Sequence, residues 1–266
     1  MSKFTVFGGN GFIGRHLVAN LKAAGHQVTT IGRGALPTPH SELGHVIYCI
    51  GYTGDFRSHL ADTVRAHVSI LIDLVERVEL ESLLYLSSTR VYAGSVSGTE
   101  DSVLTIPQAA LDGIYNLSKL TGEALCLSHK NEKFRVTRIS NVIGPDAGSD
   151  DFLPSVVAEV KRCGKVVLQN GPKFSKDYID VDDVCDALRM ISLSGKARLY
   201  NVASGVQTTN EQIATLLRKY MNAEVEYAAG SESSVFPAIA NRRLCSEFPF
   251  SPRTFDAAFK RMIDQQ

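Results

Sequence analysis

The segment Phe7-Gly8-Gly9-Asn10-Gly11-Phe12-Ile13-Gly14 decides the fold, because it joins a short apolar stretch to a longer amphipathic one. Residues 4–7 predict a β-strand, whereas residues 12–24 have the periodicity of a helix that Gly25 ends. A strand, a glycine-rich turn and a helix in this order predict a βα unit at the beginning of the chain.

The glycines of this turn are spaced for contact with a dinucleotide. Gly8 and Gly11 allow a sharp turn and let the backbone approach a pyrophosphate, and Gly14 allows the helix to pack closely on the strand. The N-terminus of the helix then faces the anion. We therefore expect dinucleotide binding here, with a tight structural turn as the alternative.

The end of the second predicted strand bears on which dinucleotide binds. A carboxylate at this place holds the ribose 2′-hydroxyl of NAD, but this chain has Ile31-Gly32-Arg33-Gly34. The planar guanidinium of Arg33 suits the 2′-phosphate of NADP. The sequence therefore favours NADP, with NAD possible and an exposed loop arginine as the alternative.

Short apolar segments alternate with amphipathic ones, which predicts an α/β fold with a Rossmann-type, doubly wound parallel sheet. Further strands are predicted at 27–31, 45–50, 82–86 and 134–139, and further helices at 56–78 and 108–129. We expect residues 1–144, with 172–204 contributing, to form a dinucleotide-binding domain. Residues 145–266, where the alternation is less regular, are expected to form mainly a smaller substrate-binding lobe.

The connection between the second and third predicted strands is unusually short. Residues 34–44 cannot hold a further strand together with its crossover helix. Pro37 and Pro39 also oppose a helix in this segment. We therefore expect one edge strand–helix unit to be absent, which leaves about six main strands.

Tyr115 and Lys119 lie four residues apart within a predicted helix and so share one face. A phenol is a poor acid or base at neutral pH, and a neighbouring ammonium favours its ionised form. This pair predicts a proton-transfer site. Ser88 follows the strand at 82–86, where ligands bind in open parallel sheets, and is expected to orient a substrate oxygen against Tyr115.

Composition and charge restrict the function classes. The 266 residues carry 28 Lys and Arg and 28 Asp and Glu, a balance unlike that of a nucleic-acid or membrane-surface binder. No apolar run reaches the ~20 residues that span a bilayer. The five cysteines are scattered without a metal-ligand spacing, so we expect reduced thiols, no metal site and a cytoplasmic protein without a signal peptide.

The chain resembles the extended branch of the short-chain dehydrogenase/reductase superfamily, which includes the sugar-nucleotide epimerases, dehydratases and reductases. The matching stretches, in family order, are GGNGFIG at 8–14, LSSTRVY at 86–92, YNLSK at 115–119, RISNVIGP at 138–145, DYIDVDDV at 177–184 and YNVASG at 200–205. The resemblance implies that Ser88, Tyr115 and Lys119 form the catalytic triad. The residues expected to contact the cofactor are Gly8, Asn10, Gly11, Phe12, Ile13, Gly14, Arg33, Gly51, Tyr115 and Lys119.

The resemblance also implies a substrate site. Asn141 takes the place of an asparagine that contacts the phosphates of the substrate nucleotide, and Lys176 stands where many relatives carry a phosphate-binding arginine. Arg242 or Arg243 is a candidate for a second phosphate contact, with plain surface charge as the alternative. The residues expected to contact the substrate are Ser88, Thr89, Tyr115, Asn141, Lys176 and Arg242.

Thr89 and Arg90 occupy the two places that hold an acidic pair in the dehydratases, so a 4,6-dehydratase is not expected. The first hypothesis is an NADP(H)-preferring reductase of a keto group on a nucleotide-linked sugar. The second is a nucleotide-sugar epimerase that uses the same triad with NAD(P). A reductase of apolar ketones and a non-catalytic dinucleotide-binding scaffold or sensor are further alternatives. Relatives often dimerise through the helix that carries the tyrosine, so a homodimer is possible.

Overall fold

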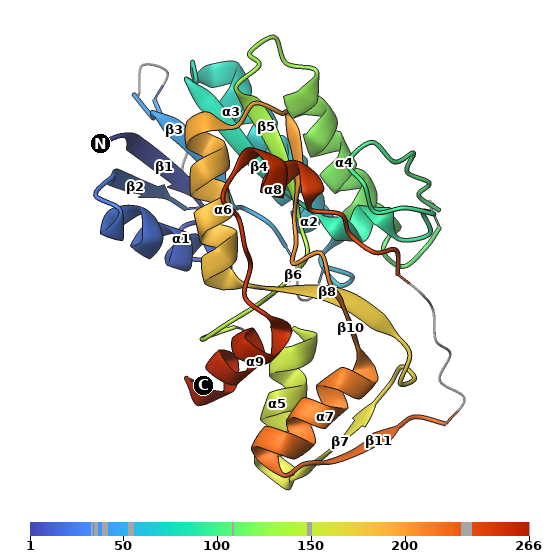
Figure 1. Ribbon diagram of the computed structural model, residues 1–266. Coiled ribbons are helices and arrows are strands. Elements are labelled where there is room, and N and C mark those ends of the chain that lie inside the picture. Colours follow the sequence, from blue (N-terminus) through green and yellow to red (C-terminus); the bar gives the residue numbers. More distant parts are fainter. Residues whose placement is uncertain are drawn as a thin grey trace.

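A computed structural model describes residues 1–32, 34, 37–38, 42–52, 56–107, 109–147, 151–229 and 236–265. Its main sheet has six parallel strands in the order β2-β1-β3-β4-β5-β9, which confirms the predicted parallel α/β fold (Figure 1). The strands are β1 (Lys3–Phe7), β2 (Gln27–Ile31), β3 (His45–Tyr48), β4 (Ser82–Ser88), β5 (Phe134–Ile139) and β9 (Leu199–Val202). Within the described residues β2 is the edge strand, as the short connection at 34–44 predicts.

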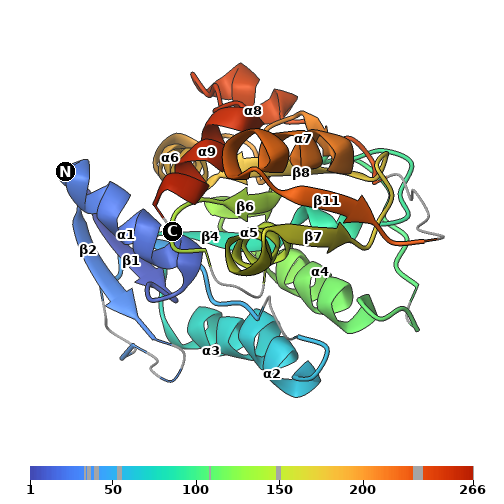
Figure 2. The ribbon, with the colours of Figure 1, turned by 90° about the horizontal axis from the view of Figure 1, so that it is seen from below.

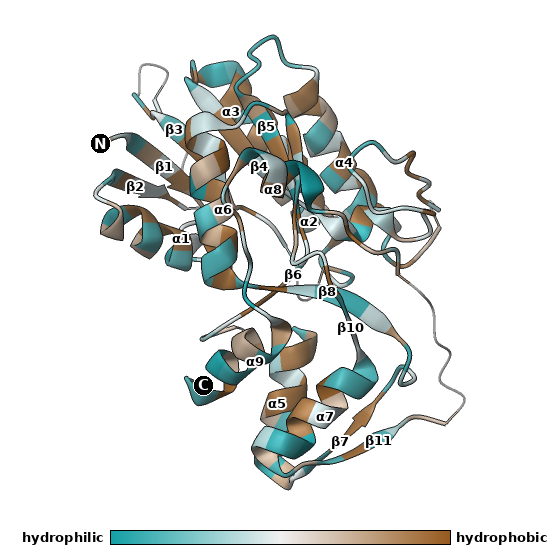
Figure 3. Cartoon of the chain, viewed as in Figure 1, coloured by the Kyte–Doolittle hydropathy of each residue, from teal (hydrophilic) through white to brown (hydrophobic). Residues whose placement is uncertain are grey.

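Helices cover both faces of this sheet (Figure 2). On one face, α1 (Phe12–Ala23) and α6 (Val181–Ser194) contribute Leu17, Leu21 and Leu188 to a continuous apolar core with β1 and β4. On the other face, α3 (Ile70–Arg77) and α4 (Gly113–Leu127) pack on β3, β4 and β5. Apolar residues concentrate on the central strands and the inner sides of these helices (Figure 3).

Two predicted helices differ from the observed ones. The helix expected at 56–78 consists of α2 (Leu60–Val64), a π-helical turn from Arg65 to Ser69, and α3. The side chain of Tyr85 donates a hydrogen bond to the backbone oxygen of His67 at 3.2 Å, so this turn is fixed to the central strand β4. The helix expected at 108–129 begins only at Gly113, because residues 109–112 form turns and a bend at the surface.

The smaller lobe has a core of its own. It contains α5 (Phe152–Cys163), α7 (Asn210–Met221), α9 (Phe255–Asp264) and the parallel pair β7 (Lys165–Leu168) and β11 (Glu224–Tyr227). A three-stranded sheet of β6 (Asn141–Ile143), β8 (Ser175–Asp180) and β10 (Gln207–Thr209) lies between this lobe and the main sheet (Figure 1). The short helix α8 (Arg242–Glu247) returns to the main body, where Leu244 joins the core around α6.

Ion pairs fix α9 to the beginning of α6. Arg261 contacts Asp180 and Asp182 at 2.6 Å each, and Arg253 contacts Asp180 and Asp183. Asp180 also caps α6, because its side chain accepts a hydrogen bond from the backbone N–H of Asp182. The two lobes therefore meet through a charged junction next to β8.

Candidate active site

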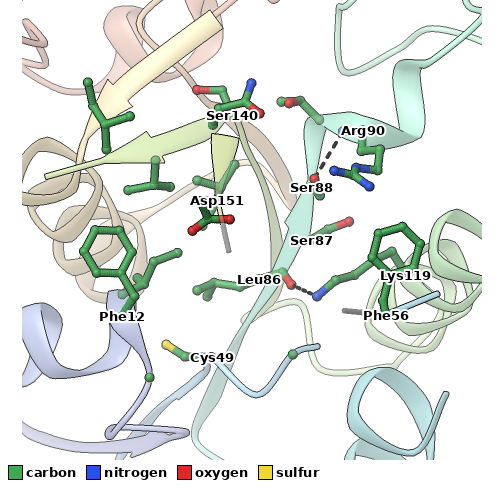
Figure 4. Close-up of a pocket in the computed structure, with 18 of the residues that line it drawn as sticks. Phe12, Cys49, Phe56, Leu86, Ser87, Ser88, Arg90, Lys119, Ser140 and Asp151 are labelled. Carbon is green, nitrogen blue, oxygen red and sulfur yellow. Dashed lines mark hydrogen bonds between the residues drawn. The ribbon is translucent and has the colours of Figure 1, made fainter. Parts of the chain in front are cut away.

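A cleft of about 890 Å³ opens at the carboxyl ends of the main strands, between the two lobes (Figure 4). The glycine-rich turn, the ends of β3, β4 and β5, and residues of α4 line it from the main body. Residues of β6, β8 and the beginning of α5 line it from the smaller lobe. The cleft is therefore at the edge of the sheet where open parallel α/β proteins bind their ligands.

The glycine-rich turn has the close backbone contacts that its sequence predicts. Gly8 has φ +78°, and a Cβ there would lie 3.0 Å from the backbone of Cys49. A Cβ at Gly14 would collide with the carbonyl oxygen of Gly8. The N-cap of α1 is Gly11, which leaves the beginning of the helix uncovered by any capping side chain. The turn residues that line the cleft are Gly8, Asn10, Gly11, Phe12, Ile13 and Gly14.

The glycine-rich turn forms a cradle that fits a dinucleotide. Gly8 and Gly14 carry no side chain at the two positions where the backbone packs closely against other backbone atoms. Gly32, at the end of β2, also lines the cleft, whereas Arg33 lies outside the described residues. Gly51 lines the cleft as well, and a Cβ at that position would lie 3.6 Å from Lys119 Nζ. The predicted cofactor residues that the structure describes therefore share one cleft.

Tyr115 and Lys119 lie one turn apart on α4, and both line this cleft although each is about 95% buried. Lys119 Nζ donates a hydrogen bond to the backbone oxygen of Leu86 at 2.8 Å, which ties α4 to the end of β4 (Figure 4). Ser88, two residues further along, lines the same cleft and is one of the groups that lower the pKa of Tyr115. The structure therefore brings the three predicted triad residues together.

The ionisation of this triad is set mainly by burial. Burial raises the pKa of Tyr115, and the guanidinium of Arg90 and the hydrogen bond with Ser88 act in the opposite direction. Burial lowers the pKa of Lys119 to about 7, although the carboxylate of Glu123 opposes this shift. Near neutral pH, Lys119 exchanges its proton readily and Tyr115 keeps its own, which suits an acid that donates a proton to an oxygen.

Arg90 was not predicted as part of the site. Its guanidinium carbon lies 5.2 Å from the centroid of the Tyr115 ring and 5.2 Å from that of Phe56. Its Nη1 donates to Asp112 Oδ2 at 3.3 Å, and Arg57 donates to the other oxygen of Asp112 at 2.6 Å. The position of Arg90, two residues after Ser88, is the signal in the sequence that could have identified it.

His67 is the second residue that sequence reasoning missed. It is fully buried in the π-helical turn, with its ring edge against Tyr115 at 5.1 Å between centroids. Its Nδ1 pairs with Ser118 Oγ at 2.8 Å, and Ser118 donates to the backbone oxygen of Tyr115 at 2.9 Å. The backbone N–H of Tyr52 donates to Nε2 at 3.4 Å, so the neutral form with the proton on Nδ1 satisfies both contacts.

Burial lowers the pKa of His67 to about 2, and the nearby charge of Lys119 acts in the same direction. The imidazole is therefore neutral throughout the pH range in which a protein of this kind is folded. It supports the backbone of α4 through Ser118 and packs against the ring of Tyr115.

A buried ion pair supports α4 behind the site. Arg138 on β5 makes a bidentate contact with Glu123, with its Nη2 2.7 Å from Oε2. Ser87 donates to the same carboxylate at 2.5 Å, and Arg138 also donates to Tyr92 Oη at 2.9 Å. Because both charges are almost fully buried, this network holds the helix of Tyr115 and Lys119 against β4 and β5.

The predicted substrate residues divide into two groups. Thr89, Asn141 and Lys176 line the cleft beside Ser88 and Tyr115. Arg242 belongs to α8 and is not among the described residues that line the cleft, so its phosphate contact stays a prediction. The alternative, Arg243, is held by Asp101 at 2.8 Å and by the backbone oxygen of Leu199.

Fold and site together define an α/β protein with a dinucleotide cradle and a buried Ser–Tyr–Lys group in one cleft. Two overlapping matches to the model of the NAD dependent epimerase/dehydratase family span residues 4–60 and 38–203. The chain belongs to this family, and it is an NAD(P)-dependent oxidoreductase or epimerase of the extended short-chain dehydrogenase type. The sequence-based recognition of the family is therefore confirmed.

Among the described residues, no helix combines the length and the apolar surface that crossing a bilayer requires.

Several reductases are among the curated relatives. The chain is 28% identical over 254 residues to GDP-6-deoxy-D-mannose reductase of Pseudomonas aeruginosa, which covers 83% of this chain and 81% of the relative. It is 23% identical to dTDP-4-dehydro-6-deoxy-D-allose reductase of a Streptomyces species, over 80% of this chain and 79% of the relative.

Solved structures share the fold over the whole chain. The structure of RMD from Pseudomonas aeruginosa complexed with NADPH has a TM-score of 0.82 at 22% identity and covers 100% of this chain and 98% of its own. MoeE5 in complex with UDP-glucuronic acid and NAD also has a TM-score of 0.82 at 22% identity, with 99% and 98% covered.

Proposed function

We propose that the protein is an NADP(H)-preferring reductase of a keto group on a nucleotide-linked sugar. The observation that carries this proposal is the meeting of Ser88, Tyr115 and Lys119 beside the glycine-rich cradle in one cleft. The similarity to GDP-6-deoxy-D-mannose reductase over most of both chains supports a reductase with such a substrate.

The residues of the cleft fit this reaction. When bound, NADPH supplies the hydride for reduction of a carbonyl carbon. The hydroxyl groups of Ser88 and Tyr115 both donate hydrogen bonds to the carbonyl oxygen, and Tyr115 then transfers its proton to that oxygen. The buried Lys119, whose pKa is about 7, lies on the same helix face and helps to restore the proton of the phenol.

The substrate side of the cleft suits a nucleotide diphosphate. Lys176 is largely buried, and no carboxylate of the described residues lies within ion-pair distance of its Nζ. Asn141 Nδ2 is held by the backbone oxygen of Asp177 at 2.7 Å, at the place where β6 meets β8. A point charge and an amide at the wall of the cleft are suited to phosphate oxygens.

NADP preference rests on the sequence at the end of β2, where Arg33 follows Gly32 and no carboxylate is present. Thermal shifts with NADPH and NADH test this part, because a ligand that binds the folded state raises its stability. We expect a larger shift with NADPH, and loss of this difference in Arg33→Ala. Equal shifts in the wild type would contradict NADP preference.

Substrate assays separate the two activities. We expect oxidation of NADPH with a 4-keto sugar nucleotide, measured as loss of NADPH absorbance. Interconversion of two sugar nucleotides without net change in absorbance would show an epimerase instead. Absence of both activities with cofactor bound would favour the non-catalytic alternative.

A further inference from the structure

The charges on the wall of the cleft are unbalanced. Four cations of the described residues line it, Arg57, Arg90, Lys119 and Lys176, against a single carboxylate, that of Asp151. Asp112 lies behind this wall and pairs with Arg57 and Arg90 together. Two guanidinium groups thus share one carboxylate, and the cleft keeps an excess of positive charge.

The guanidinium of Arg90 is held in a defined position beside the reacting centre. The ring of Phe56 contacts the guanidinium groups of Arg57, at 4.6 Å from the centroid, and of Arg90, at 5.2 Å. The ring of Tyr115 and the carboxylate of Asp112 also contact Arg90. A guanidinium fixed in this way loses little conformational entropy when it binds a ligand.

Arg90 also keeps most of its donors available. In the described part of the chain, its side chain donates one hydrogen bond, from Nη1 to Asp112 at 3.3 Å. Its side chain is 34% exposed and faces the cleft (Figure 4). A planar guanidinium with free parallel donors matches the two oxygens of a carboxylate.

The place of Arg90 fixes which part of a substrate it meets. Ser88 and Tyr115 mark the position of the carbonyl oxygen, and Arg90 follows Ser88 by two residues while it lies over the Tyr115 ring. A substituent near the keto carbon is therefore the part of the substrate closest to Arg90. Lys176, on the other lobe, remains available for the diphosphate.

We propose that Arg90, positioned by Asp112 and assisted by Arg57, binds a carboxylate on the sugar near the keto carbon. The substrate class is then a nucleotide-linked keto sugar acid, and this inference rests on the function proposed above. Substrate carboxylate and nucleotide diphosphate are both anions, so the test must distinguish them.

Matched ligand pairs make that distinction. Calorimetric titrations with the NADP⁺-bound protein use UDP-glucuronic acid against UDP-glucose, and GDP-mannuronic acid against GDP-mannose, because each pair differs at one carboxylate. We expect the acid to bind about 10-fold more tightly than its neutral partner in at least one pair, as one charge-assisted contact allows. Arg90→Met should remove this preference and leave the neutral sugar nucleotide unaffected, and Arg90→Lys should keep part of it.

The control variant and NADP⁺ binding separate a failure of the carboxylate assignment from a failure of the proposed function. Arg65 is an exposed arginine at the beginning of the π-helical turn, and it pairs with Asp62 outside the cleft. The Arg65→Met variant should therefore keep the full preference for the acid. Unchanged NADP⁺ binding shows that each variant is folded. Equal binding of acid and neutral partner, or an equal loss of both in Arg90→Met, would overturn the carboxylate assignment and leave the proposed function standing. If NADP⁺ binds and none of the four sugar nucleotides does, the proposed function fails and the assignment fails with it.

Discussion

The guanidinium of Arg90 lies over the ring of Tyr115, with its central carbon 5.2 Å from the ring centroid. The spacing of Tyr115 and Lys119 predicts that the lysine is the cation that acts on the phenol. In the structure, Arg90 is the foremost group that opposes the effect of burial on the pKa of Tyr115. Lys119 instead donates to the backbone of β4 and has its own pKa lowered to about 7.

Replacement of Arg90 should change the pH dependence of reduction. Tyr115 donates a proton, so the rate falls as pH rises through the pKa of its phenol. Arg90→Gln removes the charge that lowers this pKa, and the alkaline limb of kcat against pH should move to higher pH. Arg90→Lys keeps the charge and should keep the limb near its wild-type position. A limb that stays in place in Arg90→Gln would show that Arg90 does not act on the phenol.

Lys119→Met should stabilise the fold near neutral pH, because it removes a buried ammonium. The pKa of Lys119 is about 7 in the folded protein and ordinarily 10.5, so the unfolded chain binds more protons between these two values. The free energy of unfolding of the wild type, relative to Lys119→Met, should therefore rise with pH across this window, by up to about 1.4 kcal/mol per pH unit.

Urea denaturation at several pH values measures this difference, with the exposed Lys130→Met as the control. The control should show no comparable dependence on pH. A wild type that loses stability relative to Lys119→Met as pH rises would contradict the lowered pKa.

The buried pair of Glu123 and Arg138 should carry a large part of the local stability. Glu123→Ala leaves an unpaired guanidinium inside the protein and should cost about 3–5 kcal/mol of the free energy of unfolding. Asp73→Ala breaks an exposed pair with Arg77 on α3 and should cost less than about 1 kcal/mol. Chemical denaturation compares the two, and similar small losses would mean that the buried pair does not hold α4.

His67 should matter for turnover without titrating. His67→Leu removes the contact with Ser118 and should lower kcat by about 10-fold or more, because the backbone beneath Tyr115 is no longer held. His67→Asn keeps a donor and should retain more of the rate. The shape of the pH profile should be the same in all three proteins, since the pKa of His67 is about 2. A neutral-pH limb that disappears in His67→Asn would contradict this positioning role.

Local patterns in the sequence were sufficient for much of the fold. The glycine-rich turn, the helix α1 and the strands β1 to β5 follow from spacing, and the edge position of β2 follows from the short connection that contains Pro37. The bounds of α4 did not follow, because its start depends on turns that precede Gly113. The π-helical turn depends on contacts with Tyr85, which is distant in sequence.

The candidate site was predictable only for the residues that belong to recognisable sequence motifs. Tyr115 and Lys119 share a helix, and Ser88 ends a strand, so their meeting follows from the fold. Arg90 and His67 reach Tyr115 through contacts between separate elements, which periodicity does not encode.

The rate of a single turnover shows whether Tyr115 donates the proton. Wild type and Tyr115→Phe are saturated with NADPH, mixed with a 4-keto sugar nucleotide that the wild type reduces, and followed by NADPH absorbance. We predict that the single-turnover rate of NADPH oxidation is at least about 10²-fold lower in Tyr115→Phe, with NADPH affinity unchanged. The phenol proton is lost in this variant, while the glycine-rich cradle is intact. A near-normal rate in Tyr115→Phe would contradict the assignment of Tyr115 as the proton donor.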